Sequence, residues 1–153
     1  MSTRTAQHTY TIKEAAALTG LPASTLRYYE SIGVIAPISR GASSKHRVYD
    51  EDDLDQLMWV ACLAATGMSV SAMRQYVANG QRGPAAATDQ IELLAAQEER
   101  LAIEAENIAL RQRYVRLKID YWHAVAAGDT GRADRVAGEA RTLADALKGG
   151  RQQ

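Results

Sequence analysis

One short segment of the chain gathers side chains that suit contact with a phosphate backbone. The segment STLRYYESIGVIAP begins with hydroxyl, guanidinium and phenol groups at Ser24, Thr25, Arg27 and Tyr28. Such groups need hydrogen-bond partners when they are buried, whereas at a surface they can hold phosphate oxygens. Arg27 could pair with guanine through two hydrogen bonds or clamp a phosphate, and the sequence leaves both open. The competing interpretation is an ordinary solvated helix in which Arg27 pairs with Glu30.

A second group of basic and aromatic residues follows later in the chain, at Lys45, His46, Arg47 and Tyr49. On a hairpin, two cations and a tyrosine can straddle a minor groove and its phosphates. As an isolated run of charge, the same residues would be a solvated turn. Thr11 and Lys13, farther upstream, could add a phosphate contact at the N-terminus of a helix.

The charge distribution agrees with a polyanion-binding module at the N-terminus. Residues 1–50 carry six Lys or Arg and three Asp or Glu, a net charge of +3, and the remainder carries twelve and fifteen, a net charge of −3. The whole chain is therefore neutral, and only its first third has the local positive charge expected of a nucleic-acid contact.

The chain of 153 residues contains one cysteine, so an intramolecular disulfide is impossible and a reducing compartment is favoured. No apolar run approaches the length of a membrane span, and the first residues, MSTRTAQHTY, lack a signal-peptide core. We therefore expect a cytoplasmic protein without a membrane partner.

The elements that would position the first cluster are short helices separated by glycines. A helix over about residues 12–19 would be capped by Thr11, and a second helix would run from the first cluster to Gly33. Two short helices around a tight turn form a helix-turn-helix. We expect Tyr29 to pack inward against the apolar side of this motif.

Two strands are expected next, over residues 34–38 and 47–49, joined by the polar link at 41–44. Pro37 limits the first strand to the edge of a sheet because it has no N–H to donate. A hairpin beside a helix-turn-helix is the wing of a winged helix, and it would carry the second basic cluster.

Two more helices, from about Asp50 to Thr66 and from Ser69 to Asn79, complete the N-terminal half. We expect a mainly α fold in which a winged helix-turn-helix is followed by a long helix. The expected regions are a DNA-binding domain at 1–80, a linker at 81–88, a coiled-coil dimerisation helix at 89–127, and a short C-terminal helix with its tail at 128–153.

A seven-residue repeat of apolar side chains predicts a coiled coil in the long helix. Its seam consists of Leu94, Leu101, Ala105, Ile108, Val115, Ile119 and Trp122. A second apolar stripe, through Ile103, Leu110 and Leu117, lies on another face. The alternative is a monomeric helical bundle, but the chain after this helix is too short to bury both faces, so we expect a homodimer. We expect the last helix, at about 132–147, to dock on the partner's long helix.

The sequence resembles the MerR family of bacterial transcription regulators. The resemblance covers residues 10–78 and rests on TLRYYE followed by HRVYDEDDL. It implies an antiparallel dimerisation helix and a homodimer on double-stranded DNA at a palindromic operator inside an overlong promoter spacer. It further implies that the active dimer distorts this spacer so that RNA polymerase engages both promoter elements, by deformation energy that protein contacts supply.

Cys62, in WVACLAATGM, is the candidate sensor residue. Its place resembles that of the single cysteine in the aldehyde- and electrophile-responsive branch of the family, which implies a thiolate adduct or an oxidation. The alternative is a buried, inert cysteine that packs near Met58, with a non-covalent small-molecule inducer. The scattered histidines and the lack of further cysteines argue against a metal site or a cofactor. About thirty residues after the long helix are too few for a drug-binding domain with a pocket of a few hundred Å³.

Other function classes fit less well. The N-terminal module has no paired carboxylates, no nucleophile with a base and no phosphate-binding glycine loop, so we do not expect an enzyme. A winged-helix DNA architectural or recombination accessory protein is the alternative of another class. Such proteins usually lack a dedicated dimerisation helix, and a monomeric mass in solution would favour this alternative.

Overall fold

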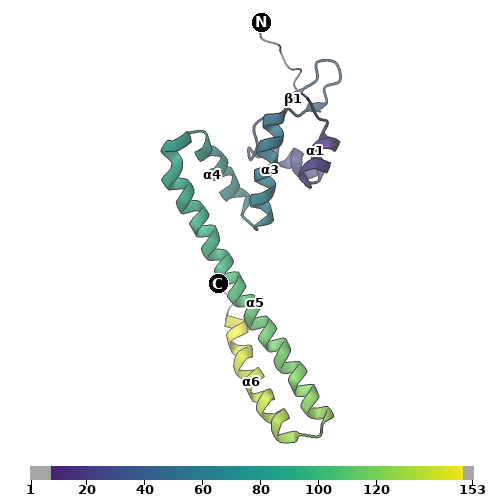
Figure 1. The fold of residues 1–153 in the computed structure, drawn as a ribbon, viewed down its shortest axis with the longest axis vertical. Coiled ribbons are helices and arrows are strands. Elements are labelled where there is room, and N and C mark those ends of the chain that lie inside the picture. The colour runs from purple at the N-terminus through teal and green to yellow at the C-terminus, as the bar shows by residue number, and fades with distance from the viewer. Residues whose placement is uncertain (1–7, 150–153) are drawn as a thin grey trace. The chain divides into compact units, whose positions relative to one another are not determined.

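The computed structural model describes residues 8–149 and is mainly helical, with one two-stranded hairpin (Figure 1). The chain divides between Leu94 and Ala95 into two compact units, each with its own apolar cluster. The first unit contains α1 (Ile12–Thr19), α2 (Ala23–Ser31), β1 (Ser39–Arg40), β2 (Arg47–Val48), α3 (Glu51–Ala65), α4 (Val70–Gly80), the 3-10 helix η1 (Gly83–Ala86) and the start of α5 (Ala87–Ala126). The second contains the rest of α5 and α6 (Thr130–Gly149). The predicted fold class, a helix-turn-helix followed by one long helix, is confirmed.

The predicted domain limits stay predictions, and their outer ends at residues 1 and 153 lie outside the described part of the chain. No helix within residues 8–149 has both the length and the hydropathy that a membrane span requires.

The first helix begins and ends where the sequence predicts. The Thr11 hydroxyl accepts a hydrogen bond from the Glu14 backbone N–H at 3.2 Å, and the Glu14 carboxylate accepts one from the Thr11 N–H at 3.1 Å. This capping box satisfies two backbone donors at the helix start, and the bond from the Thr11 backbone lowers the pKa of Glu14. At the other end Gly20 has a φ of 76°, a left-handed conformation that glycine adopts without a Cβ clash.

The helix-turn-helix packs into the apolar cluster of the first unit. Tyr29 is buried there, as predicted, together with Leu26 and Val34. α2 begins at Ala23, before the predicted start, because Pro22 occupies the N-cap position with an extended backbone. Helices α3 and α4 close the cluster with the side chains of Leu54, Leu57, Val60 and Met73. Close packing of these side chains holds α1 and α2 in a defined geometry.

The wing is shorter than the sequence predicts. The strand expected over residues 34–38 is wrong: β1 begins after it and pairs antiparallel with β2. The N–H groups of the preceding segment are used by other parts of the first unit, and Pro37 has none to donate. These donor and acceptor pairs are Val34 N–H to the Tyr29 carbonyl at 2.9 Å, Ala36 N–H to Gln56 Oε1 at 3.2 Å, and Ile38 N–H to Glu30 Oε2 at 3.0 Å. Tertiary hydrogen bonds therefore replace the expected strand ladder.

The base of the wing is anchored at both ends. Tyr10 and Tyr49 exchange backbone hydrogen bonds of 2.8 and 2.9 Å, which ties the chain before α1 to the end of β2. Asp50 and Asp53 then form a second capping box, with bonds of 2.8 and 3.0 Å, that starts α3. The hairpin is thus fixed to the starts of two helices.

A buried polar network fixes the corner between α4, η1 and α5 in the first unit. The Asn79 side chain is 4% exposed, and its oxygen accepts hydrogen bonds from Gln75 Nε2 at 2.7 Å and Arg82 Nη2 at 3.2 Å. Its amide nitrogen donates to Gln90 Oε1 at 3.1 Å, and Arg82 also bonds Asp89 at 2.6 Å. A single side chain therefore joins the end of α4 to the start of α5.

Replacing Asn79 with alanine is expected to lower the free energy of unfolding by about 1–3 kcal/mol, because it removes the shared partner of buried polar groups. Urea denaturation measures this loss. Gln81→Ala is the matched control: Gln81 is exposed and its side chain makes no hydrogen bond within residues 8–149, so a change below about 0.5 kcal/mol is expected. Equal losses in the two variants would show that the network does not stabilise the corner.

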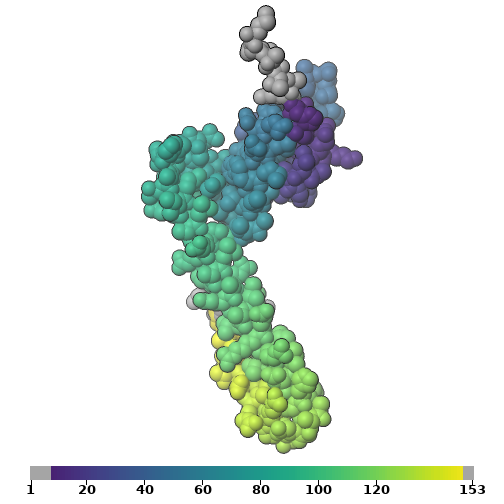
Figure 2. Space-filling model, viewed as in Figure 1, coloured from purple at the N-terminus to yellow at the C-terminus, as the bar shows by residue number. Residues whose placement is uncertain are grey.

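The second unit is an antiparallel pair formed by α5 and α6, and α6 follows one side of α5 (Figure 2). Leu117, Ala140 and Leu143 are buried between the helices, with Leu110 and Val136 packed against them. The expected docking of the last helix on a partner's long helix is therefore wrong, because this helix packs on α5 of its own chain. Only three residues separate α5 from α6, and so short a connection makes the two helices antiparallel neighbours.

Candidate nucleic-acid interface

Three segments of the first unit meet at a surface groove of about 250 Å³. They are the start of α1, helix α2 and the hairpin, so residues distant in sequence share one site. Ile12 and Arg40 line the groove together with five of the predicted residues: Thr11, Lys13, Arg27, His46 and Arg47. The two clusters recognised in the sequence are thus parts of one surface.

The groove is basic, because Lys13, Arg27, Arg40 and Arg47 line it and no carboxylate does. The charge of Arg47 is balanced in part, since its Nε lies 2.6 Å from Glu30 Oε1. Within residues 8–149 no ion pair involves Arg27, so the interpretation in which Arg27 pairs with Glu30 is wrong. An unpaired guanidinium in a groove without acids is suited to bind an anion.

Glu30 positions the wing rather than neutralising α2. Its carboxylate accepts hydrogen bonds from Arg47 on β2 and from the Ile38 backbone N–H, so it joins α2 to both sides of the hairpin. Partial burial opposes ionisation of Glu30, but these two hydrogen bonds outweigh it and the pKa of Glu30 is lowered. The sequence gives no sign of this contact, because its partners are 8 and 17 residues away without a local pattern.

The remaining predicted residues of α2 lie at its surface but outside the groove. Ser24 is exposed, Thr25 is half-buried, and Tyr28 is 52% exposed. No side-chain hydrogen bond caps α2, so neither hydroxyl is occupied at the helix start, where backbone N–H groups lack helical partners. The first turn of α2 therefore presents donors to whatever approaches it.

The hairpin turn presents Lys45 and His46 to solvent. Lys45 has a φ of 58°, and its carbonyl accepts a hydrogen bond from Arg40 Nη1 at 3.2 Å. The Gly41 N–H donates to the His46 carbonyl at 2.9 Å. Arg40, which was not among the predicted residues, thus both shapes the turn and lines the groove. Arg40 follows the apolar segment at residues 34–38, and nothing in the sequence there indicates a binding residue.

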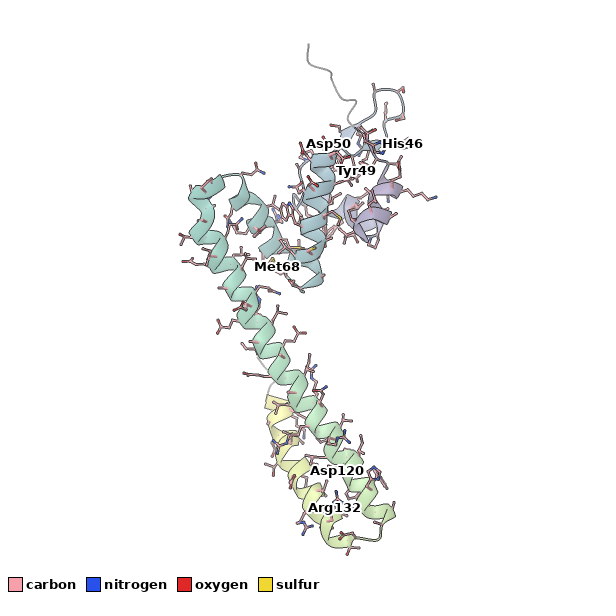
Figure 3. The ribbon with its side chains drawn as sticks, viewed as in Figure 1. His46, Tyr49, Asp50, Met68, Asp120 and Arg132 are labelled. Carbon is pink, nitrogen blue, oxygen red and sulfur yellow. The ribbon has the colours of Figure 1, made fainter. Side chains whose placement is uncertain are left out.

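Tyr49 is placed in the core, where its side chain is fully buried. Its hydroxyl has no hydrogen-bond partner within the described residues, and burial raises the pKa of Tyr49. Figure 3 labels His46, Tyr49 and Asp50, which follow one another from the hairpin into the start of α3. Because its side chain lies beneath the surface, Tyr49 supports the wing and cannot contact a ligand there without leaving the core.

Cys62 lies on α3 with its side chain exposed. Met58, one turn earlier, and Trp59 are also exposed, at 47% and 38%. The Trp59 ring contacts Tyr76 of α4 edge-on, with centroids 5.4 Å apart. In the single chain the thiol is therefore accessible, which disagrees with the alternative of a buried cysteine.

The seam of α5 is exposed along its whole length. All seven predicted residues are exposed, from Leu101 at 38% to Trp122 at 64%. At 3.6 residues per turn, Leu110 and Leu117, which α6 covers, lie on the opposite side of the helix from this seam. One apolar stripe is thus covered within the chain and the other is not.

The part of the chain that the structure describes contains no group of three or more His, Cys, Asp or Glu that could hold a metal ion.

Comparison with known proteins agrees with this architecture. Residues 10–80 match the family described as MerR HTH family regulatory protein. The HTH-type transcriptional regulator AdhR of Bacillus subtilis is 34% identical over 90 residues, which cover 59% of this chain and 64% of AdhR. The HTH-type transcriptional regulator CueR of Bacillus subtilis is 30% identical over 111 residues, which cover 72% of this chain and 74% of CueR.

Among solved structures, HiNmlR, a MerR family regulator lacking the sensor domain and bound to promoter DNA, superposes with a TM-score of 0.61 at 26% identity. The superposition covers 84% of this chain and 96% of HiNmlR. Matches to AdhR, by contrast, span less than two thirds of that relative's length. The matched domain and the likeness to CueR over 74% of its length lead to one conclusion: this chain belongs to the MerR HTH family of regulatory proteins.

Proposed function

We propose that this protein is a homodimeric, sequence-specific DNA-binding transcriptional regulator and not an enzyme. The observation that carries the proposal is the basic groove, where α1, α2 and the wing present Lys13, Arg27 and Arg47 and which no carboxylate lines. The family match over residues 10–80 supports it, as does the likeness to HiNmlR, whose structure contains promoter DNA.

In the proposed complex, α2 is the recognition helix and enters the major groove, where Arg27 and the hydroxyls of Ser24 and Thr25 meet DNA. Lys13, with the backbone N–H groups at the start of α1, holds a phosphate. The exposed side chains of the hairpin turn reach the flanking minor groove and its phosphates. Tyr28, half exposed beside Arg27, donates its hydroxyl to a phosphate oxygen.

We propose that a second copy of the chain covers the α5 seam in an antiparallel arrangement. An apolar stripe of this length on one side of a helix needs a partner, and α6 is already placed on the other side. The midpoint of the seam, between Leu94 and Trp122, is Ile108, so each Ile108 would lie beside its copy at the two-fold axis. A two-fold dimer reads two half-sites and therefore fits a palindromic operator.

The dimer would act on transcription by deforming the promoter spacer. Contacts at two half-sites can supply the free energy that bending or untwisting a short DNA segment requires, about 1–6 kcal/mol for a smooth bend. RNA polymerase would then engage both promoter elements.

The test is transcription in vitro from the gene's own upstream region with purified RNA polymerase, together with DNase I protection of the same DNA. A protected palindrome within the spacer and a changed transcript level are expected. Protection without sequence preference and an unchanged transcript level would favour a DNA architectural protein instead.

We further propose that Cys62 senses aldehydes, other electrophiles or oxidants. With an aldehyde, the thiol adds to the carbonyl carbon and its proton moves to the carbonyl oxygen, which gives a hemithioacetal. The exposure of the side chain supports this proposal.

Replacing Cys62 with serine is expected to abolish induction of a promoter reporter by methylglyoxal, because the hydroxyl is a much weaker nucleophile than a thiolate. DNA affinity without aldehyde should be unchanged in this variant, since Cys62 does not line the basic groove. Full induction in Cys62→Ser would contradict the sensor role and favour a non-covalent inducer.

A further inference from the structure

A second pocket, of about 310 Å³, lies within the second unit between α5 and the C-terminal part of α6. The sequence predicts that too few residues follow the long helix for a drug-binding domain, and this pocket needs no such domain. Two helices in a hairpin leave this partly open space between them without a separate domain. No residue of this pocket belongs to the basic groove of the first unit.

The pocket combines apolar walls with positive charge at its edge. Leu110 and the Tyr114 ring on α5 face Ala144 and Leu147 on α6. Arg111 and Lys148 also line it, and no acidic residue does. Within residues 8–149 neither cation forms an ion pair. An apolar cavity with a few convergent polar groups is the usual form of a small-molecule site.

Further positive charge lies close to the aromatic wall. Lys118 Nζ is 5.4 Å from the centroid of the Tyr114 ring, in cation–π contact. The pocket therefore has cations from both helices and no facing carboxylate, which favours an anion over a cation as its ligand. The seam does not contribute to it, since Leu110 lies on the opposite side of α5 from the seam.

We propose that this pocket binds a small organic acid with an aromatic or branched aliphatic body. The apolar body would lie between Leu110, Tyr114 and Leu147, and its carboxylate would pair with Arg111 and Lys148. The guanidinium fork of Arg111 matches two carboxylate oxygens, and the ammonium of Lys148 adds a second charge. A volume of about 310 Å³ lies at the small end of ligand pockets and suits one or two fused rings.

The test is isothermal titration calorimetry of the full chain with naphthalene-2-carboxylate and with its neutral amide, naphthalene-2-carboxamide. Saturable binding of the acid is expected, with the amide at least about tenfold weaker because it lacks the charge. Arg111→Gln and Lys148→Gln should each raise the dissociation constant of the acid by about tenfold. Arg141→Gln is the matched control, because Arg141 is an exposed cation on α6 that does not line the pocket.

Backbone amide NMR shifts locate the bound acid, and shifts are expected at residues 107–114 and 144–148. The proposal would be overturned by no saturation up to about 10 mM acid, by equal affinity for acid and amide, by an equal loss in Arg141→Gln, or by shifts confined to the seam. DNA affinity, measured in parallel, should be the same in all three variants. Failure of acid binding therefore leaves the proposed DNA-binding function intact.

Discussion

Replacing Arg27 with alanine is expected to weaken binding of the dimer to its operator by about thirtyfold or more. The side chain lines the basic groove, is exposed, and has no ion-pair partner within residues 8–149. A dimer carries two copies of Arg27, and each contact of this kind contributes about 1–3 kcal/mol to binding. The loss of binding free energy is therefore about 2–6 kcal/mol. Fluorescence anisotropy with a labelled duplex measures it.

The same titration distinguishes the two roles left open for Arg27. If Arg27 binds phosphate, the variant binds all sequences more weakly, and the slope of log K against log salt becomes shallower by about 2. If it binds guanine, discrimination between operator and scrambled DNA relaxes instead. Arg74→Ala is the matched control, since Arg74 is exposed on α4 and does not line the groove. Equal losses of DNA affinity in the two variants would contradict a role for α2 in the interface.

Replacing Ile108 with glutamate is expected to convert the dimer into monomers at micromolar concentration. In the proposed antiparallel pair, the two glutamates would lie beside each other at the centre of an apolar seam. Burying two like charges there costs several kcal/mol, which corresponds to a dissociation constant raised by about a thousandfold or more. The single chain should keep its fold, because Ile108 is already 44% exposed in it.

Ile103→Glu is the matched control for this prediction. Ile103 lies on the same helix and is 52% exposed, but it is not part of the seam. Analytical ultracentrifugation gives the mass of each variant, and circular dichroism checks that helix content is kept. A dimeric Ile108→Glu protein, or equal dissociation in both variants, would contradict pairing through the seam.

The sequence predicts best those features that depend on neighbouring residues. Thr11, Glu14 and Gly20 define α1 through local capping, so its bounds follow from the sequence alone. The inward position of Tyr29 follows from helical spacing in the same way.

Features set by tertiary contacts could not be predicted. The first strand is displaced because Glu30 and Gln56 capture N–H groups from a segment whose composition suits a strand. Tyr49 carries a polar group that suggested the surface, yet its ring fills the core under the wing. The apolar stripe of α6 could pack against many helices. The three-residue connection is what places α6 against α5 of its own chain.

The measurement that tests the central claim most directly is binding of the wild-type dimer to a duplex from its own upstream region across a salt series. Lys13 and Lys45 on each of two protomers would make about four phosphate contacts, or about six if Arg27 also binds phosphate. A slope of log K against log salt of about −4 to −5 is therefore predicted, with weaker binding to a scrambled duplex. A slope near zero, or no binding, would contradict the assignment of the basic groove to DNA.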